Sequence, residues 1–366
     1  MKYTKLEKLN IEVSKLGLGA MRFPIKDGKI DQEQVNEMVK VAFEGGVNYF
    51  DTAYVYNDGD SERTLGKALK QLNREKFFVA DKMPFWLVKK PEDVERIWNE
   101  SLENLDVKYF DFYLMHALDR GNFESMMKFN GLSWAIEKKK QGLIKYLGFS
   151  IHDDFELLEE VLNLYDWDFV QIQYNYMDLE DKPGKKGYEE IAKRNIPIII
   201  MEPLKGGMLA IMPESIKEPF TKIGDASSAS YSFRWLAEKD GIATILSGMS
   251  NVEQLKENID IFRYLKPLNE SELEAIEEVK NNINSRQKVK CTGCNYCMPC
   301  PAGVEIPENF KAWNTQAMNT SDNWISGTSI NYKNASKCVE CRICASHCPQ
   351  KIDIPNKIKE MISEKE

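Results

Sequence analysis

The thiol side chains of this sequence are confined to one short stretch. All eight cysteines lie between Cys291 and Cys348, and the first 290 residues contain none. They form two runs, spaced C-x2-C-x2-C-x2-C-P and C-x2-C-x2-C-x3-C-P. Clustered spacing in an intracellular protein indicates metal or redox chemistry rather than disulfides. The candidate metal ligands are Cys291, Cys294, Cys297 and Cys300 of the first run, and Cys338, Cys341, Cys344 and Cys348 of the second.

Two kinds of metal site compete for these cysteines. Zinc knuckles use two cysteines in one turn and a second pair at a distance. Three cysteines at consecutive x2 gaps instead suit one face of a cubane cluster and make a poor tetrahedral frame for zinc. The spacing therefore favours iron and sulfide over zinc.

The two runs resemble those of two-cluster bacterial ferredoxins, in which the fourth cysteine of each run binds the other cluster. This resemblance implies two 4Fe-4S clusters with crossed ligands. One would be held by Cys291, Cys294, Cys297 and Cys348, and the other by Cys338, Cys341, Cys344 and Cys300.

A second chemical group precedes the cysteines. Asp51, Lys82 and His116 end short apolar runs, and Tyr56 follows the first of them. A tyrosine with an ordinary pKa of about 10 is a weak acid, but a neighbouring ammonium lowers that pKa and a carboxylate fixes the ammonium. A histidine would orient a substrate oxygen. Taken singly, each residue also fits a structural ion pair or a core histidine; together they predict a general acid for carbonyl reduction.

The elements that position these residues alternate between apolar runs and helical segments, which predicts an α/β fold with a (β/α)8 TIM barrel. The expected strands are residues 16–18, 49–51, 77–82, 111–115, 144–149, 169–173, 197–201 and 243–246. The expected helices are residues 31–44, 62–72, 91–105, 155–164, 188–194, 228–239, 252–264 and 270–284. We expect the barrel over residues 1–285 and a small α-rich ferredoxin-like domain over 286–366, with a linker near 282–290 and helices at 307–318 and 355–363.

The sequence Asp51-Thr52-Ala53-x-x-Tyr56, with Lys82 and His116 at the next two strand ends, resembles the aldo-keto reductases. The resemblance extends from about residue 5 to residue 262. It implies that Tyr56 is the catalytic acid and that the cofactor is a nicotinamide dinucleotide. The cofactor-binding residues that it implies are Ser150, Gln171, Met201, Pro203, Leu204, Gly206, Gly248, Ser250, Gln254 and Asn258.

The sequence departs from that family at three places. Ile151 stands where many members have an asparagine for the nicotinamide amide, and Met201 stands where many have a stacking aromatic. Gly248 and Gln254 occupy the positions of the cations that bind the 2′-phosphate of NADP. The resemblance therefore leaves NADP and NAD both open.

Composition and net charge limit the classes of partner that we expect this protein to bind. The formal charge of −8 disfavours nucleic-acid binding, which depends on Lys and Arg at phosphates. No apolar run approaches the roughly 18 residues of a membrane helix, and the first ten residues lack a secretory apolar segment. We expect a cytoplasmic protein with a small carbonyl or alcohol substrate and an electron-transfer partner such as ferredoxin or flavodoxin.

Two functions fit these features. The first is an NAD(P)H-dependent carbonyl reductase or alcohol dehydrogenase with appended clusters. The second is an electron-transfer or redox-sensing module whose barrel mainly docks a partner. Clusters move single electrons and nicotinamide moves hydride, a two-electron unit, and no flavin motif bridges them. Retention of all four residues of the proposed acid site favours the enzyme.

Overall fold

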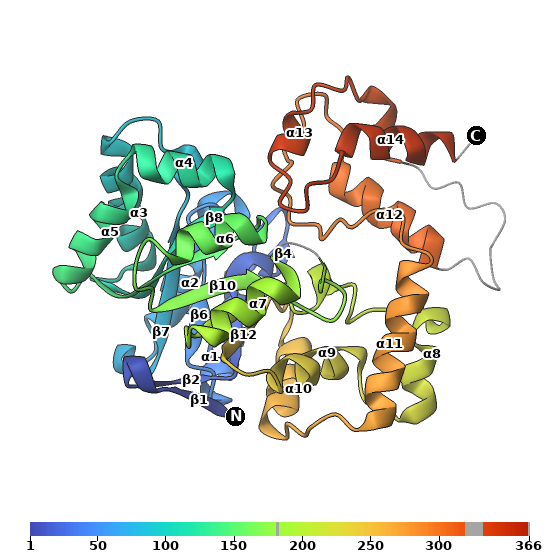
Figure 1. Cartoon of the computed structure of the whole chain (residues 1–366), viewed down its shortest axis with the longest axis horizontal. Helices are drawn as coiled ribbons and strands as arrows, with labels where there is room; N and C mark the ends of the chain where they lie inside the picture. Colours follow the sequence, from blue (N-terminus) through green and yellow to red (C-terminus); the bar gives the residue numbers. More distant parts are fainter. Residues whose placement is uncertain (181–182, 319–331, 365–366) are drawn as a thin grey trace. The chain divides into compact units, whose positions relative to one another are not determined.

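The structure, a computed structural model, describes residues 1–180, 183–318 and 332–364. It divides into two compact units (Figure 1). The first comprises Met1–Pro203 and Phe233–Pro267. The second comprises Leu204–Ser232 and Leu268–Glu366, so the segment that follows Pro203 groups with the cysteine-containing part of the chain.

The first unit is a closed barrel of parallel strands, as the sequence predicts. All eight expected strands are present and join in the order β10-β11-β12-β3-β6-β7-β8-β9. The barrel closes where Ile245 of β12 pairs with Leu16 of β3. The strands are β3 (Leu16–Gly19), β6 (Tyr49–Asp51), β7 (Phe78–Met83), β8 (Phe110–Leu118), β9 (Ile144–Ile151), β10 (Phe169–Gln173), β11 (Ile198–Met201) and β12 (Ile242–Ser247).

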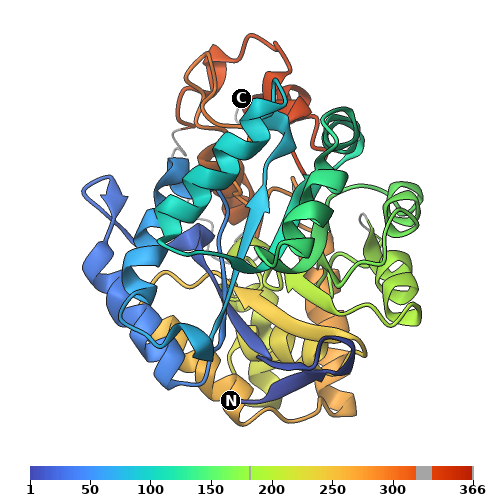
Figure 2. The same ribbon diagram turned by 90° about the vertical axis from the view of Figure 1, so that its left-hand side faces the viewer.

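Helices surround these strands (Figure 2). Asp31 caps the first of them, because its side chain accepts a hydrogen bond from the Gln34 amide at 3.1 Å. Val35, Met38 and Val39, which recur at helical spacing, form its buried face. The predicted helices are α1 (Gln32–Glu44), α2 (Asp60–Leu69), α3 (Glu92–Leu105), α6 (Phe155–Leu162), α7 (Gly184–Lys193), α9 (Ser228–Ala237) and α10 (Val252–Arg263).

Several short elements were not predicted. The hairpin of β1 (Tyr3–Leu6) and β2 (Ile11–Ser14) places Leu6 and Val13 in one apolar cluster with Tyr49 and Phe112, at the N-terminal ends of the strands. The opposite strand ends are those that carry chemistry in such barrels. The other unpredicted elements of this unit are β4 (Ile25–Lys26), β5 (Lys29–Ile30), α4 (Arg120–Lys128) and α5 (Gly131–Lys140).

The second unit is mainly helical. Its helices are α8 (Glu214–Ile223), α11 (Glu270–Asn284), α12 (Ile306–Met318), α13 (Ile343–Ser346) and α14 (Ile354–Ser363). Helix α11 has its predicted bounds and starts with a capping box of Asn269 and Glu272. Helix α8, which packs on α11, was missed because Pro219 within it is typical of a helix break.

The cysteine region has a core of its own. Val304, Phe310, Trp313 and Ile358 are buried in it, and Cys344 and Cys348 belong to the same cluster. None of the helices in the described residues has both the length and the apolar content needed to cross a membrane.

Candidate functional site

Asp51 and Lys82 form a buried ion pair at the C-terminal ends of neighbouring strands. The Lys82 Nζ atom lies 2.6 Å from Asp51 Oδ1 and donates a second hydrogen bond of 2.6 Å to the Thr52 carbonyl. The exposed fractions of the two side chains are 0% for Lys82 and 3% for Asp51. Burial raises the pKa of Asp51, and the Lys82 ammonium opposes that rise. The carboxylate therefore holds the ammonium in one position.

Tyr56 and His116 lie beside this pair. Tyr56 starts a 3-10 turn after β6, and its ring centroid is 4.8 Å from the Lys82 Nζ atom. The His116 ring meets the Tyr56 ring edge to face, with centroids 5.9 Å apart. The structure thus brings together Asp51, Tyr56, Lys82 and His116, which we call the tetrad.

The backbone at His116 differs from the expectation. His116 does not end its strand: β8 continues to Leu118 through an irregularity in its pairing with β9. Ala117 has a φ of 48°, and its amide donates a 2.7 Å hydrogen bond to Ser150 Oγ. Local bulges of this kind commonly re-aim a side chain near an active site.

The surroundings of His116 favour the neutral imidazole. Burial lowers the pKa of His116 well below its usual range, and the charges of Lys82 and His152 lower it further. The Trp86 ring lies against the same imidazole, with centroids 5.0 Å apart. Sequence reasoning missed Trp86, because an aromatic residue in a loop carries no positional signal.

Two candidate cofactor residues lie together at the ends of β10 and β11. The Gln171 Nε2 atom donates a hydrogen bond to the Met201 sulfur at 3.5 Å. The Gln171 Oε1 atom is buried and has no hydrogen-bond partner within the described chain. An amide N–H group of a ligand would satisfy this acceptor, so the residues present fit a nicotinamide carboxamide.

Of the next candidates, Gly248 and Ser250 lie in the loop after β12, and Gln254 and Asn258 lie in helix α10. Gln254 accepts a 2.9 Å hydrogen bond from the Ser250 amide through its side-chain oxygen. Asn258 is buried and donates to Ser247 Oγ at 3.1 Å. Both side chains therefore shape the loop.

Arg22 brings a cation to this loop. A Cβ atom at Gly248 would stand 3.2 Å from Arg22 Cγ, and Ser250 Oγ donates a 3.1 Å hydrogen bond to the Arg22 carbonyl. Sequence reasoning did not find Arg22, because it lies far from Gly248 along the chain. Arg22 is therefore a cationic residue whose side chain passes Gly248, one of the two positions that lack the usual cation.

Three further candidates follow β11. Pro203 ends the first segment of the first unit, whereas Leu204 and Gly206 belong to the second unit. Gly206 has a φ of 68°, and a Cβ atom there would stand only 2.1 Å from the Thr292 carbonyl oxygen. This segment is therefore packed on the first cysteine run.

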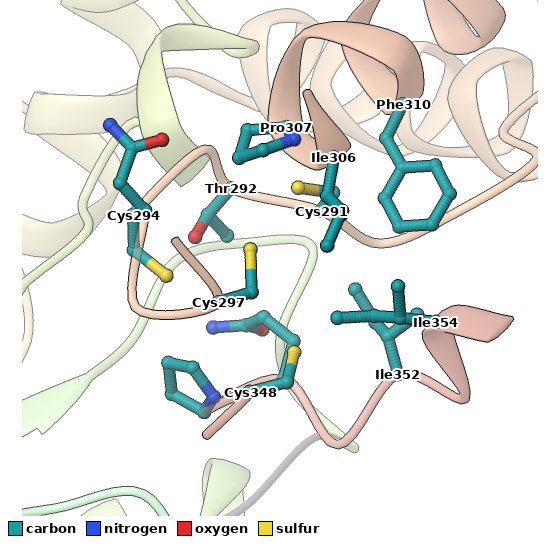
Figure 3. Close-up of a pocket in the computed structure, with 13 residues that line it drawn as sticks. Cys291, Thr292, Cys294, Cys297, Ile306, Pro307, Phe310, Cys348, Ile352 and Ile354 are labelled. Atoms are coloured by element: carbon teal, nitrogen blue, oxygen red, sulfur yellow. The ribbon is translucent and has the colours of Figure 1, made fainter. Parts of the chain in front are cut away.

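Cysteines of both runs line one pocket (Figure 3). Cys291, Cys294 and Cys297 come from the first run, and Cys348 comes from the second. The rest of the lining is largely apolar and includes Ile306, Phe310, Ile352 and Ile354. All eight cysteines lie in the described residues and none is in a disulfide. This grouping supports the crossed ligand set.

Neighbouring thiols in this pocket raise the pKa of Cys297. Burial raises the pKa of Cys297 to about 12, with further contributions from Cys294, Cys291 and Cys348. A raised pKa favours the neutral thiol, so a positively charged metal centre would be needed to hold these cysteines as thiolates. A second group of thiols lies around Cys344. Burial raises the pKa of Cys344, and Cys300, Cys338 and Cys341 raise it further. These are the other three ligands expected for the second cluster.

The two runs also share a backbone conformation. The residues before and after the second cysteine of the first run, Gly293 and Asn295, have φ values of 68° and 66°. At the same places in the second run, Glu340 and Arg342 have φ values of 56° and 60°. Two loops built alike suit two equivalent cluster faces better than a single zinc site.

Comparisons with known proteins identify the family of the barrel and the type of the cysteine domain. Residues 15–281 match the aldo/keto reductase family, and residues 290–352 match a 4Fe-4S dicluster domain. The NADH-specific methylglyoxal reductase of Escherichia coli (strain K12) is 24% identical over 307 residues, covering 71% of this chain and 93% of that protein.

Solved structures of two aldo-keto reductases share the fold. The holo form of AKR11C1 from Bacillus halodurans is 23% identical, with a TM-score of 0.62 over 76% of this chain and 96% of its own. The Klebsiella pneumoniae enzyme in complex with NADPH is 19% identical, with a TM-score of 0.60 over 76% of this chain and 95% of its own. The chain belongs to the aldo/keto reductase family of oxidoreductases and carries a 4Fe-4S dicluster domain.

Proposed function

We propose that the barrel reduces a small carbonyl compound, or oxidises the corresponding alcohol, with a nicotinamide cofactor and with Tyr56 as the general acid. The geometry of the tetrad carries this proposal: a buried ammonium lies 4.8 Å from the Tyr56 ring and is fixed by a carboxylate at 2.6 Å. A bound nicotinamide supplies or accepts hydride.

Each residue of the tetrad has one role. Tyr56 donates a proton to the substrate oxygen as that oxygen becomes an alkoxide. The Lys82 ammonium stabilises the phenolate that remains, and Asp51 keeps the ammonium in place. His116, held neutral by its buried environment, donates a hydrogen bond that orients the substrate oxygen.

A matched pair of tyrosine variants tests this assignment. Tyr56→Phe should lower kcat by at least about 10²-fold, the usual contribution of general acid catalysis, with the Kd of the cofactor unchanged. Tyr54→Phe is the control, because the Tyr54 hydroxyl donates to Glu100 rather than contacting the tetrad. Equal turnover in wild type and Tyr56→Phe would assign the proton to another group.

The cofactor-binding residues follow from the same barrel end. We infer that Gln171 accepts a hydrogen bond from the nicotinamide amide through its unpaired buried oxygen and that Met201 packs beside the ring. Ser150 holds the bulge at Ala117 and so positions His116. The named relatives include an NADH-specific reductase and an NADPH complex. We infer that Arg22 supplies a limited attraction for the 2′-phosphate.

We propose that the second unit binds two 4Fe-4S clusters with crossed ligands. The pocket lined by Cys291, Cys294, Cys297 and Cys348 supports the first set. The second ligand set is supported by the effect of Cys300, Cys338 and Cys341 on the pKa of Cys344. Clustered cysteines that form no disulfide, together with a metal centre, suit a reducing compartment, so we infer a cytoplasmic location.

A redox-sensing or electron-transfer role is a second candidate, and the surroundings of the second cluster favour it. Cys341 is exposed, and the flanking Val339 and Ile343 side chains are 70% and 48% exposed. An external carrier such as ferredoxin or flavodoxin would meet an accessible cluster there. Adding NADH or NADPH to anaerobic protein separates the two functions: bleaching of the cluster absorbance shows electron transfer from nicotinamide, and unchanged absorbance during turnover removes the clusters from the reaction.

A further inference from the structure

The chain segment that follows β11 is attached to the residues that lead into the first cysteine run. Gly206 rests on the Thr292 carbonyl oxygen, 2.1 Å from the position of an added Cβ atom. Gln287 approaches the Met208 sulfur at 3.8 Å, and Arg286 donates a 3.0 Å hydrogen bond to Ser215 Oγ. These contacts all lie within the second unit.

Thr292 is itself part of the first cluster pocket. It follows Cys291 directly, is 4% exposed and lines the pocket with Cys291 and Cys294 (Figure 3). The backbone that carries two cluster ligands is therefore the surface on which Gly206 packs. Any side chain at Gly206 would displace this backbone, because the obstacle is a carbonyl group and not a flexible side chain.

The same segment has a position that suits phosphate. In (β/α)8 barrels the loops after the seventh and eighth strands frequently bind phosphate groups. Strand β11 is the seventh barrel strand along the chain and ends at Met201, so residues 204–206 lie in the seventh loop. This loop also contains Lys205, a buried cation.

We propose that cofactor binding at residues 204–206 is linked to the oxidation state of the cluster held by Cys291, Cys294, Cys297 and Cys348, through the contact of Gly206 with Thr292. The inference rests on the proposed function, since it requires a nicotinamide dinucleotide. Reduction adds one negative charge beside a loop that binds an anionic pyrophosphate, and like charges repel. The oxidised protein therefore binds the cofactor more tightly.

Linkage makes the effect reciprocal. If reduction weakens cofactor binding, the bound cofactor lowers the reduction potential of that cluster. A tenfold change in affinity corresponds to about 59 mV for a one-electron couple. The cluster accepts its electron from an added reductant, and no bond to the nucleotide forms or breaks.

Adenosine diphosphate ribose is a suitable probe, because it carries the pyrophosphate but no nicotinamide and cannot exchange electrons with the cluster. Its Kd is measured anaerobically on the full-length, cluster-loaded protein, oxidised and after dithionite reduction. We expect binding to weaken roughly tenfold on reduction, and the potential of one cluster to fall by about 59 mV when the probe is saturating. Equal Kd values in the two states would overturn the linkage.

Two glycine variants test the contact. Gly206 and Gly207 both have positive φ values, 68° and 97°, so alanine is strained at each. Only Gly206 faces Thr292, since no described atom lies within 4 Å of a Cβ at Gly207. Gly206→Ala should reduce the tenfold ratio to less than about twofold, whereas Gly207→Ala should retain it. A ratio retained in Gly206→Ala would exclude this contact as the link.

Two further results keep the test decisive. If Gly206→Ala fails to retain iron, the wild-type comparison of Kd and potential still decides the linkage. Tyr56→Phe should keep the full ratio although its turnover is lost, which separates this inference from the acid assignment. Absence of probe binding in both states would overturn the proposed cofactor and the linkage together, whereas equal binding overturns the linkage alone.

Discussion

The Lys82 ammonium and the Asp51 carboxylate lie 2.6 Å apart and are almost fully shielded from water. Removing one partner leaves the other charge buried, which typically costs about 3–5 kcal/mol, whereas removing both is often close to neutral. Asp51→Asn should therefore lower the free energy of unfolding by about 3–5 kcal/mol. Adding Lys82→Met should recover at least half of that loss.

Anaerobic urea unfolding, followed by tryptophan fluorescence, measures these differences. All variants retain the same cysteine region, so its contribution cancels in the comparison. If the double variant lost the sum of the two single losses, the pair would not be energetically coupled.

His116 predicts a pH dependence of stability. Its pKa is lowered in the folded protein, mainly by burial, from an ordinary value of 6.5. Below pH 6.5 the unfolded chain binds a proton at this position that the folded protein does not, so stability falls as the pH falls towards the folded pKa. The slope from this one group is at most about 1.36 kcal/mol per pH unit.

His116→Gln removes this titration and keeps a hydrogen-bonding side chain. The stability advantage of wild type over this variant should therefore shrink between pH 7.5 and pH 5.5, measured by urea unfolding at each pH. Other buried groups such as Asp51 are common to both proteins and largely cancel. A constant difference across this range would show that His116 is not kept neutral by the fold.

The sequence predicted the barrel because strands buried on both faces appear as continuous apolar runs, as in Phe110–Leu118, where every residue is buried. The tetrad was predictable for the same reason, since polar residues interrupt those runs. Helices α4 and α5 were missed because each buries only two residues, which leaves little apolar periodicity: Phe123 and Met126 in α4, and Gly131 and Ala135 in α5.

Contacts set by barrel closure were not predictable. Arg22 approaches Gly248 and Ser250 because β3 pairs with β12, and nothing local to Arg22 indicates that neighbour. The packing of Gly206 on Thr292 is similarly remote in sequence. Sequence patterns indicate which face of an element is buried, but not which distant loop covers it.

Cofactor preference is a third prediction. Because Gly248 and Gln254 replace the usual cations, NADPH should bind less than about tenfold more tightly than NADH, a difference below about 1.4 kcal/mol. The part of the preference that remains should depend on Arg22. Arg22→Ala should bring the two Kd values to within about twofold of each other in fluorescence titrations.

Lys256→Ala is the matched control, because Lys256 is an exposed cation on α10 beyond the loop. It should leave the NADPH to NADH ratio unchanged. A preference for NADPH of roughly a hundredfold, about 2.7 kcal/mol, that survives Arg22→Ala would show that another cation binds the 2′-phosphate.

The crossed ligand set predicts which cluster each cysteine serves. Anaerobic analysis should give about eight iron and eight sulfide per chain, as two cubane clusters require. Cys348 lines the pocket of the first run although it belongs to the second. Cys348→Ala should therefore impair the cluster held by Cys291, Cys294 and Cys297, seen as loss of one of two coupled paramagnetic signals in the reduced protein.

Cys300→Ala is the reciprocal variant and should impair the cluster of Cys338, Cys341 and Cys344 instead. Ser346→Ala is the control, because Ser346 lies two residues before Cys348 and its exposed hydroxyl donates to the Ile343 carbonyl. Since each fourth cysteine ties one run to the other, loss of either should also broaden the signal of the remaining cluster.

If Cys348→Ala instead removed the Cys338–Cys344 cluster and left the first intact, each run would bind its own cluster. Zinc in place of iron after strictly anaerobic preparation would rule out electron transfer by this unit.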